Sequence, residues 1–102
     1  MKDQMIIASI QMYSTGDKER NLQTMEKYLE HINKAFPNIR MVVFPELAAH
    51  GSISNMRKEA EIIPGELTST FSNMANKYNL WLIPGSIYEK SENEIFNTTC
   101  LL

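Results

Sequence analysis

The sequence has little cysteine and no excess of basic residues, and these two absences exclude several classes of protein. Cys100 is the only cysteine among 102 residues, so the chain has no internal disulfide framework. Ten Lys and Arg are balanced by twelve Asp and Glu, which gives a net charge of −2. A protein that binds nucleic acid usually carries a basic patch or stripe, so we expect no nucleic-acid partner.

Long hydrophobic runs and glycine clusters are also missing. No apolar run approaches the roughly 20 residues that cross a bilayer, and the N-terminus lacks a signal-peptide cleavage site, so we expect a cytoplasmic chain with no membrane partner. Gly51, Gly65 and Gly85 are isolated, which excludes a glycine-rich phosphate loop. No His, Cys or carboxylate pair has metal-ligand spacing, so we expect neither a metal nor a cofactor.

The first half of the chain has the pattern of a strand, a helix and a second strand. Met5–Met12 is short and nearly continuous in apolar residues, as in a buried strand. Asp17 is suited to cap a following helix. Ile39–Phe44 predicts the second strand, which Pro45 ends. The helix between them has one apolar stripe at three- and four-residue steps, made of Leu22, Met25, Leu29, Ile32 and Phe36.

The second half predicts one more helix and two more strands. A helix follows Pro64–Gly65 and ends at Asn79, which suits the left-handed position after a helix. Leu80–Tyr88 predicts a third strand with a bulge or unpaired edge at Pro84, and Ile95–Leu102 a fourth that forms a hairpin with it. The order β-α-β-α-β-β, with two βαβ crossovers, indicates an α/β fold in one small domain.

Glu46 is the residue with the clearest chemical potential. It follows the second predicted strand directly, and ligands of open α/β sheets bind just outside the carboxyl ends of strands. A carboxylate placed there behind an apolar run is expected to be partly desolvated, and desolvation would raise its pKa and suit it to general-base catalysis. The alternative is that Glu46 is an ordinary exposed loop carboxylate.

The segment Val42–Gly51, with the sequence Val-Val-Phe-Pro-Glu-Leu-Ala-Ala-His-Gly, resembles the glutamate motif of the nitrilase superfamily of carbon–nitrogen hydrolases. The similarity extends, in order and with suitable spacing, over essentially all 102 residues. The other segments that resemble the family are Ala8–Met12, Gly16–Leu22, Ile63–Gly65, Leu82–Ser86 and Phe96–Thr99.

The resemblance implies the N-terminal part of an α-β-β-α sandwich enzyme with a Glu-Lys-Cys triad. Such an enzyme cleaves a non-peptide amide or a nitrile of a small molecule through a covalent acyl-enzyme. Only the glutamate maps onto this sequence, at Glu46, in the role of general base. The catalytic lysine and cysteine are absent from this chain, because their motifs follow the fourth strand in family members. We also expect the complete protein to be a homo-oligomer.

Five other residues are weaker candidates. Cys100 lies in an apolar segment without a basic neighbour and is expected to be an inert thiol. Lys58 belongs to a solvated charge cluster, His50 to a polar loop that could border a pocket, and His31 to the outer face of the first helix. Asn97 matches a family position on the fourth strand, where we expect a structural hydrogen bond, with a pocket-lining role as the alternative.

The sequence ends at Leu102 inside a predicted apolar strand, and we therefore expect residues 1–102 to be a truncated part of one hydrolase domain. Such a piece is expected to be inactive and to leave apolar sheet surface poorly covered. Two alternatives remain. One is a short non-catalytic binding or assembly module that keeps half of the fold. The other is a flavodoxin-like ligand-binding domain, although Tyr13–Gly16 lacks a phosphate-binding loop.

Overall fold

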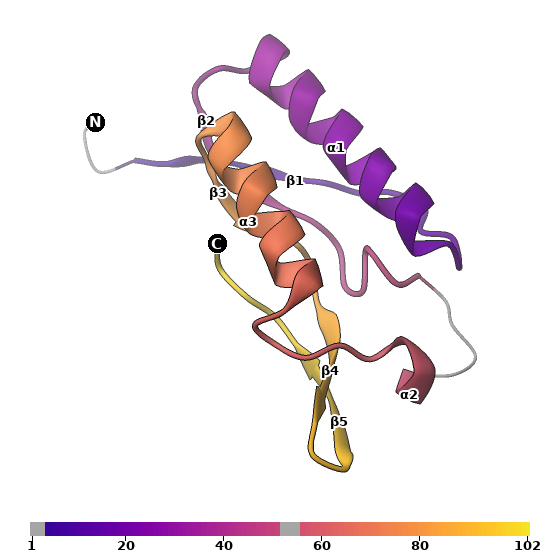
Figure 1. The fold of residues 1–102 in the computed structure, drawn as a ribbon. Helices are drawn as coiled ribbons and strands as arrows, with labels where there is room; N and C mark the ends of the chain where they lie inside the picture. The colour runs from indigo at the N-terminus through magenta and orange to yellow at the C-terminus, as the bar shows by residue number, and fades with distance from the viewer. Residues whose placement is uncertain (1–3, 52–55) are drawn as a thin grey trace.

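The structure, a computed structural model, describes residues 4–51 and 56–102 and contains two helices packed on a small parallel sheet (Figure 1). Within the described residues, no helix is long and apolar enough to cross a membrane. The elements in chain order are β1 (Ile6–Ser9), α1 (Lys18–Ala35), β2 (Ile39–Val43), α2 (Met56–Glu59), α3 (Glu66–Tyr78), β3 (Trp81–Ile83), β4 (Ile87–Ser91) and β5 (Glu94–Thr98).

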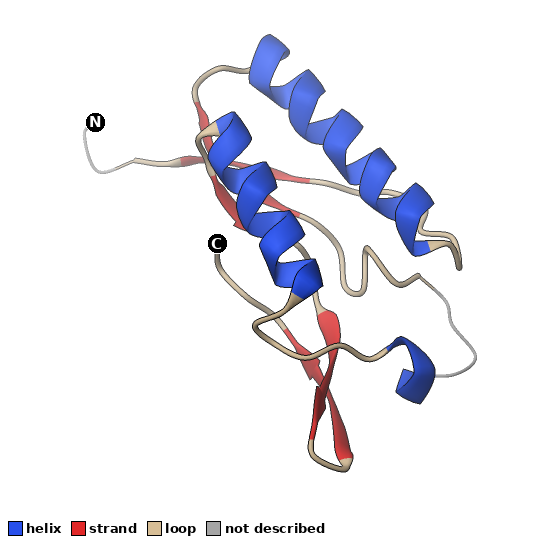
Figure 2. Ribbon diagram, viewed as in Figure 1, coloured by secondary structure: helices blue, strands red, loops and turns tan. Residues whose placement is uncertain are grey.

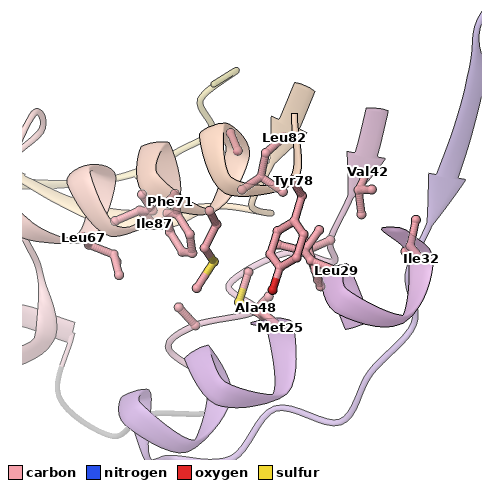
Figure 3. Packing of buried hydrophobic residues seen from close by; sticks show 14 residues of the cluster. Met25, Leu29, Ile32, Val42, Ala48, Leu67, Phe71, Tyr78, Leu82 and Ile87 are labelled. Carbon is pink, nitrogen blue, oxygen red and sulfur yellow. The ribbon is translucent and has the colours of Figure 1, made fainter. Parts of the chain in front are cut away.

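The first three strands form a parallel sheet in the order β1-β2-β3, as the two predicted βαβ crossovers require. Ala8, Val42 and Leu82 are register partners across the sheet. Val42 and Leu82 are fully buried, and they pack in the core with residues of α1 and α3 (Figure 3). Both helices lie on the same side of the sheet (Figure 2), so the predicted α/β layering is confirmed.

Helix α1 begins as predicted and ends one residue earlier than the apolar stripe suggests. Asp17 is its N-cap, and the side chain of Asp17 accepts a hydrogen bond from the backbone N–H of Arg20 at 3.2 Å. The expected burial of Phe36 is wrong, because this side chain is 55% exposed. Phe36 is the C-cap, where the backbone has left the helical conformation, with φ −135° and ψ 71°. The stripe members that are buried are Met25, Leu29 and Ile32.

Helix α3 confirms the predicted second helix. Its N-cap is Gly65, and its C-cap is Asn79 in the left-handed conformation, with φ 51°. The short helix α2 precedes α3, and residues 52–55 before α2 lie outside the described residues. The buried apolar side chains of α3 are Leu67, Phe71, Met74, Ala75 and Tyr78.

The predicted third strand, Leu80–Tyr88, is wrong as a single element. It divides into β3 and β4 around the buried segment 84–86, where Pro84 has no N–H for a ladder and Gly85 has φ +85°. Strand β4 pairs antiparallel with β5 in a separate two-stranded sheet, which confirms the predicted hairpin. After β5, Leu102 exchanges two backbone hydrogen bonds with Leu82 at 2.8 and 2.9 Å, so the chain returns beside β3.

The face of the parallel sheet opposite the helices is open in this chain. On this face, opposite to Val42 and Leu82, Ile7 of β1 is 52% exposed and Trp81 of β3 is 48% exposed. Isolated exposed apolar side chains are common on protein surfaces, but these two come from one face of one sheet. The expectation of poorly covered apolar sheet surface is therefore confirmed.

Candidate active site

Glu46 lies just beyond the carboxyl end of β2, as the sequence predicts. The backbone N–H of Phe44 still bonds to the carbonyl of Ile83 at 2.9 Å, so the sheet holds the chain up to the residue before Pro45. The expected desolvation of Glu46 is wrong for this chain, because its side chain is exposed. No element in the described part of the chain covers it. A shallow depression of about 340 Å³ adjoins Glu46 and is lined by Met12, Ser14, Pro45, Leu47 and Gly51.

The backbone immediately after Glu46 is tightly turned. Leu47 has φ 52°, a left-handed conformation that non-glycine residues seldom adopt. The carbonyl of Leu47 accepts hydrogen bonds from the N–H groups of His50 and Gly51 at 3.0 and 2.8 Å. The N–H of Leu47 donates to the hydroxyl of the buried Ser86 at 3.0 Å. These contacts fix the direction in which Glu46 leaves the sheet.

The segment between β1 and α1 supports the same loop from a second side. Asn21 is 1% exposed, and its amide Nδ2 donates to the carbonyls of Ala49 and Thr15, both at 2.8 Å. The Oδ1 atom of Asn21 accepts from the N–H of Thr15 at 2.7 Å. Ser14 adds a hydrogen bond from its hydroxyl to the carbonyl of Ala48 at 2.8 Å. One buried side chain thus connects α1, the loop before it and the loop that carries Glu46.

Sequence reasoning missed the role of Asn21, although a signal for it was present. Asn21 lies four residues before Met25 and eight before Leu29, so it occupies the helical stripe that is otherwise apolar. A polar residue at such a position must find hydrogen-bond partners when it is buried. The pattern alone does not say which backbone groups those partners are.

Two glycines permit the close backbone contacts around the loop. A Cβ atom on Gly85 would collide with the carbonyl oxygen of Pro45, and a Cβ atom on Gly51 would collide with that of Thr15. Both glycines also have positive φ values, +85° and +66°. Gly85 therefore approaches Pro45, and Gly51 approaches Thr15, more closely than a side chain would allow.

Asn97 of β5 contacts Glu46 directly. Its amide Nδ2 donates a hydrogen bond to Oε2 of Glu46 at 2.7 Å, across 51 residues of sequence. The hydrogen bond expected for Asn97 is therefore present, and its partner is the predicted catalytic carboxylate. Within the described residues, the other carboxylate oxygen, Oε1, has no hydrogen-bond partner. This arrangement holds one oxygen of Glu46 and leaves the second one available.

His50 is not the polar loop residue that the sequence suggests, because its side chain is 2% exposed. Its Nε2 atom accepts a hydrogen bond from the backbone N–H of Tyr88 at 3.3 Å, and the two rings lie 5.3 Å apart. Burial lowers the pKa of His50, and Lys18 lowers it further, while Glu61 and Glu59 oppose the shift. The neutral ring is the form that can accept the Tyr88 bond.

The remaining candidates lie away from Glu46 or lack reactive character. Cys100 is partly buried, and burial together with the charge of Glu89 raises the pKa of its thiol, which disfavours the nucleophilic thiolate. Lys58 is exposed on α2, and His31 is exposed on α1, where its ring contacts Phe36 edge to face. The expected surface positions of Lys58 and His31 are confirmed.

The known proteins most similar in sequence include omega-amidases and a probable nitrilase. The chain is 34% identical over 95 residues to an omega-amidase, NIT3, of Saccharomyces cerevisiae, a match over 86% of this chain and 33% of the relative. It is 35% identical over 98 residues to a probable nitrilase of Schizosaccharomyces pombe, over 90% of this chain and 36% of the relative. It is 31% identical over 93 residues to an omega-amidase, NIT2, of Danio rerio, a match over 90% of this chain and 33% of the relative.

Solved structures agree with the sequence relatives. The crystal structure of Saccharomyces cerevisiae Nit3, a member of the nitrilase superfamily, matches with a TM-score of 0.85 at 32% identity, over 95% of this chain and 39% of that one. A carbon–nitrogen hydrolase from Helicobacter pylori matches with a TM-score of 0.83 at 22% identity, over 95% of this chain and 34% of that one. At this identity the match supports the fold alone. The chain spans about a third of the length of the curated relatives it matches. Residues 6–102 match the carbon-nitrogen hydrolase family, and the chain belongs to that family.

Proposed function

We propose that this chain supplies the general base of a carbon–nitrogen hydrolase, and that the base is Glu46. The observation that carries the proposal is the presentation of Glu46 at the carboxyl end of β2, with Oε2 held by Asn97 and Oε1 without a partner among the described residues. A base needs one oxygen that can take a proton and a fixed orientation toward it. Strand ends of this kind are where open α/β sheets bind ligands.

The substrate we propose is a small-molecule amide or nitrile, and an amide is favoured because two of the relatives are named omega-amidases. In the proposed first step, Glu46 accepts the thiol proton of a cysteine, and the thiolate attacks the amide carbon. A lysine stabilises the oxyanion as it forms. The C–N bond then breaks, ammonia leaves with the proton, and a thioester remains on the cysteine.

In the second step, Glu46 takes a proton from water, and the resulting hydroxide attacks the thioester. The acid product leaves and the cysteine recovers its proton, so Glu46 acts as a base once in each half of the reaction. Neither the lysine nor the cysteine has a family-motif counterpart in these 102 residues. We therefore propose that both are supplied outside residues 1–102, and that this segment alone is inactive. The complete enzyme is proposed to be a homo-oligomer.

The proposal is tested by assaying the protein at its natural length, purified from its source, for ammonia release from a panel of small amides and nitriles. Brief mixing with substrate, acid quenching and intact-mass measurement would show the expected acyl adduct. Ammonia release together with an adduct on a cysteine outside residues 1–102 supports the proposal. The absence of hydrolysis with every compound, combined with stable capture of another protein, would favour the non-catalytic assembly module instead.

A further inference from the structure

We propose that Asn97 is a positioning residue for Glu46, which fixes the carboxylate so that Oε1 faces the proton to be transferred. This inference rests on the proposed role of Glu46 as the general base. It goes further by assigning the β4–β5 hairpin a part in catalysis. The hairpin is distant in sequence from Glu46, and Asn97 of β5 brings it into contact with the loop after β2.

The contact itself is short and specific. Asn97 Nδ2 lies 2.7 Å from Glu46 Oε2, at the short end of the range for a hydrogen bond from nitrogen to a carboxylate. A carboxylate that makes no contact can rotate about its last side-chain bond, which is broad and only weakly restricted. One strong hydrogen bond to one oxygen removes that freedom. The second oxygen then has a defined direction.

The alternation of side chains along the hairpin explains why Asn97 reaches Glu46. Tyr88 and Asn97 are direct partners in the antiparallel register, so their side chains lie on one face of the hairpin. Ser86 lies in the segment before β4 and adds a contact of its own to the loop. Ser86 binds the N–H of Leu47, Tyr88 contacts His50, and Asn97 binds Glu46. One face of the hairpin therefore contacts the loop at two places, and the segment before the hairpin contacts it at a third.

A neutral amide is a suitable donor for this purpose. A lysine or arginine in the same place would stabilise the ionised carboxylate strongly and oppose its protonation during the reaction. Three ion pairs of the described residues involve Lys18, Lys34 and Lys77, and each joins a carboxylate other than Glu46. Asn97 orients the carboxylate without a full opposing charge, so it leaves Glu46 able to accept a proton.

The substitution Asn97→Asp tests this in the protein at its natural length, with the pH dependence of kcat/KM for ammonia release as the readout. Two carboxylates at hydrogen-bond distance repel each other when both are ionised, so a proton is retained to higher pH. We expect the acid limb of the profile to move to higher pH by about one unit or more. The control is Asn93→Asp, the same charge change at the exposed turn of the hairpin, which should leave the limb in place.

An unshifted limb in Asn97→Asp, or an equal shift in Asn93→Asp, would overturn the positioning role. If Asn97→Asp does not fold, Asn97→Ala tests the positioning role instead. We expect its kcat to fall roughly tenfold with KM nearly unchanged, because an oriented hydrogen bond to a charged group is lost. A kcat within about threefold of the wild type would contradict the proposal. Glu46→Gln distinguishes a failure of the general-base role from a failure of the positioning role. If Glu46→Gln is inactive while the Asn97 variants keep normal activity, only the positioning role of Asn97 is refuted.

Discussion

Two buried polar side chains, Asn21 and His50, hold the loop that carries Glu46. Each makes hydrogen bonds to backbone groups of a different segment, Asn21 to Thr15 and Ala49 and His50 to Tyr88. A buried backbone group that loses its partner costs more than the bond contributed, because it cannot return to water. Both residues therefore matter for the geometry at Glu46 although neither touches it.

We predict that Asn21→Ala destabilises the protein by roughly 3 kcal/mol, because the Thr15 N–H and the carbonyls of Thr15 and Ala49 lose their partner. Equilibrium unfolding in urea measures the change. The matched control is Asn33→Ala on the exposed face of α1, which should change stability by less than about 0.5 kcal/mol. Equal effects of the two substitutions would show that the Asn21 hydrogen bonds do not stabilise the fold.

Burial lowers the pKa of His50 from its usual value of 6.5, and this shift predicts how the free energy of unfolding depends on pH. Below about pH 6.5 the unfolded chain takes up a proton at this histidine while the folded chain does not. The free energy of unfolding should therefore fall as the pH decreases from about 6.5 toward the lower folded-state pKa. Above pH 6.5 both states are neutral, so this contribution no longer changes.

The substitution His50→Gln removes the titration and keeps a side chain that can accept the Tyr88 bond, so stability below about pH 6.5 should depend less on pH. Urea unfolding at several pH values would show this. His31→Gln, on the exposed face of α1, serves as the control and should retain the wild-type dependence. An unchanged slope in His50→Gln would mean that His50 is not the titrating group.

At the scale of elements, local patterns predicted most of the helices and strands. The apolar stripe, Asp17 and Asn79 gave the positions of α1 and α3, because periodicity and capping depend on nearby residues alone. The carboxyl end of β2, with Glu46 beyond it, was also predicted, because a short apolar run stopped by Pro45 is a local signal. The α/β class followed from the order of these elements.

Features that depend on distant contacts were not predictable in the same way. Pro84 indicated an irregularity in the third strand, but the complete break between β3 and β4 also reflects the approach of Gly85 to the carbonyl of Pro45, a contact across 40 residues that the sequence does not reveal. The burial of His50 depends on packing against Tyr88. The exposure of Glu46 depends on which elements cover the loop. Asn97 was expected to form a hydrogen bond, but its partner came only from the structure.

At the scale of the whole molecule, the open sheet face and the partial span of the relatives lead to the same expectation. Residues of β1 and β3 expose apolar side chains, and the chain covers about a third of each curated relative. Apolar sheet surface of this kind normally packs against another layer. We predict that the protein captured from its source with an antibody to this segment has an intact mass well above 11.7 kDa. A measured mass of 11.7 kDa would contradict this and favour the assembly module.

The most direct test of the central claim is the rate of ammonia release by Glu46→Gln in the protein at its natural length. Glutamine keeps the shape of the side chain but cannot accept the proton, so we predict that kcat falls by at least about a thousandfold while the unfolding midpoint stays within a few degrees of the wild type. Glu30→Gln, on the exposed face of α1, controls for the loss of one surface charge. Near-normal ammonia release by the folded Glu46→Gln variant would contradict the assignment of Glu46 as the general base.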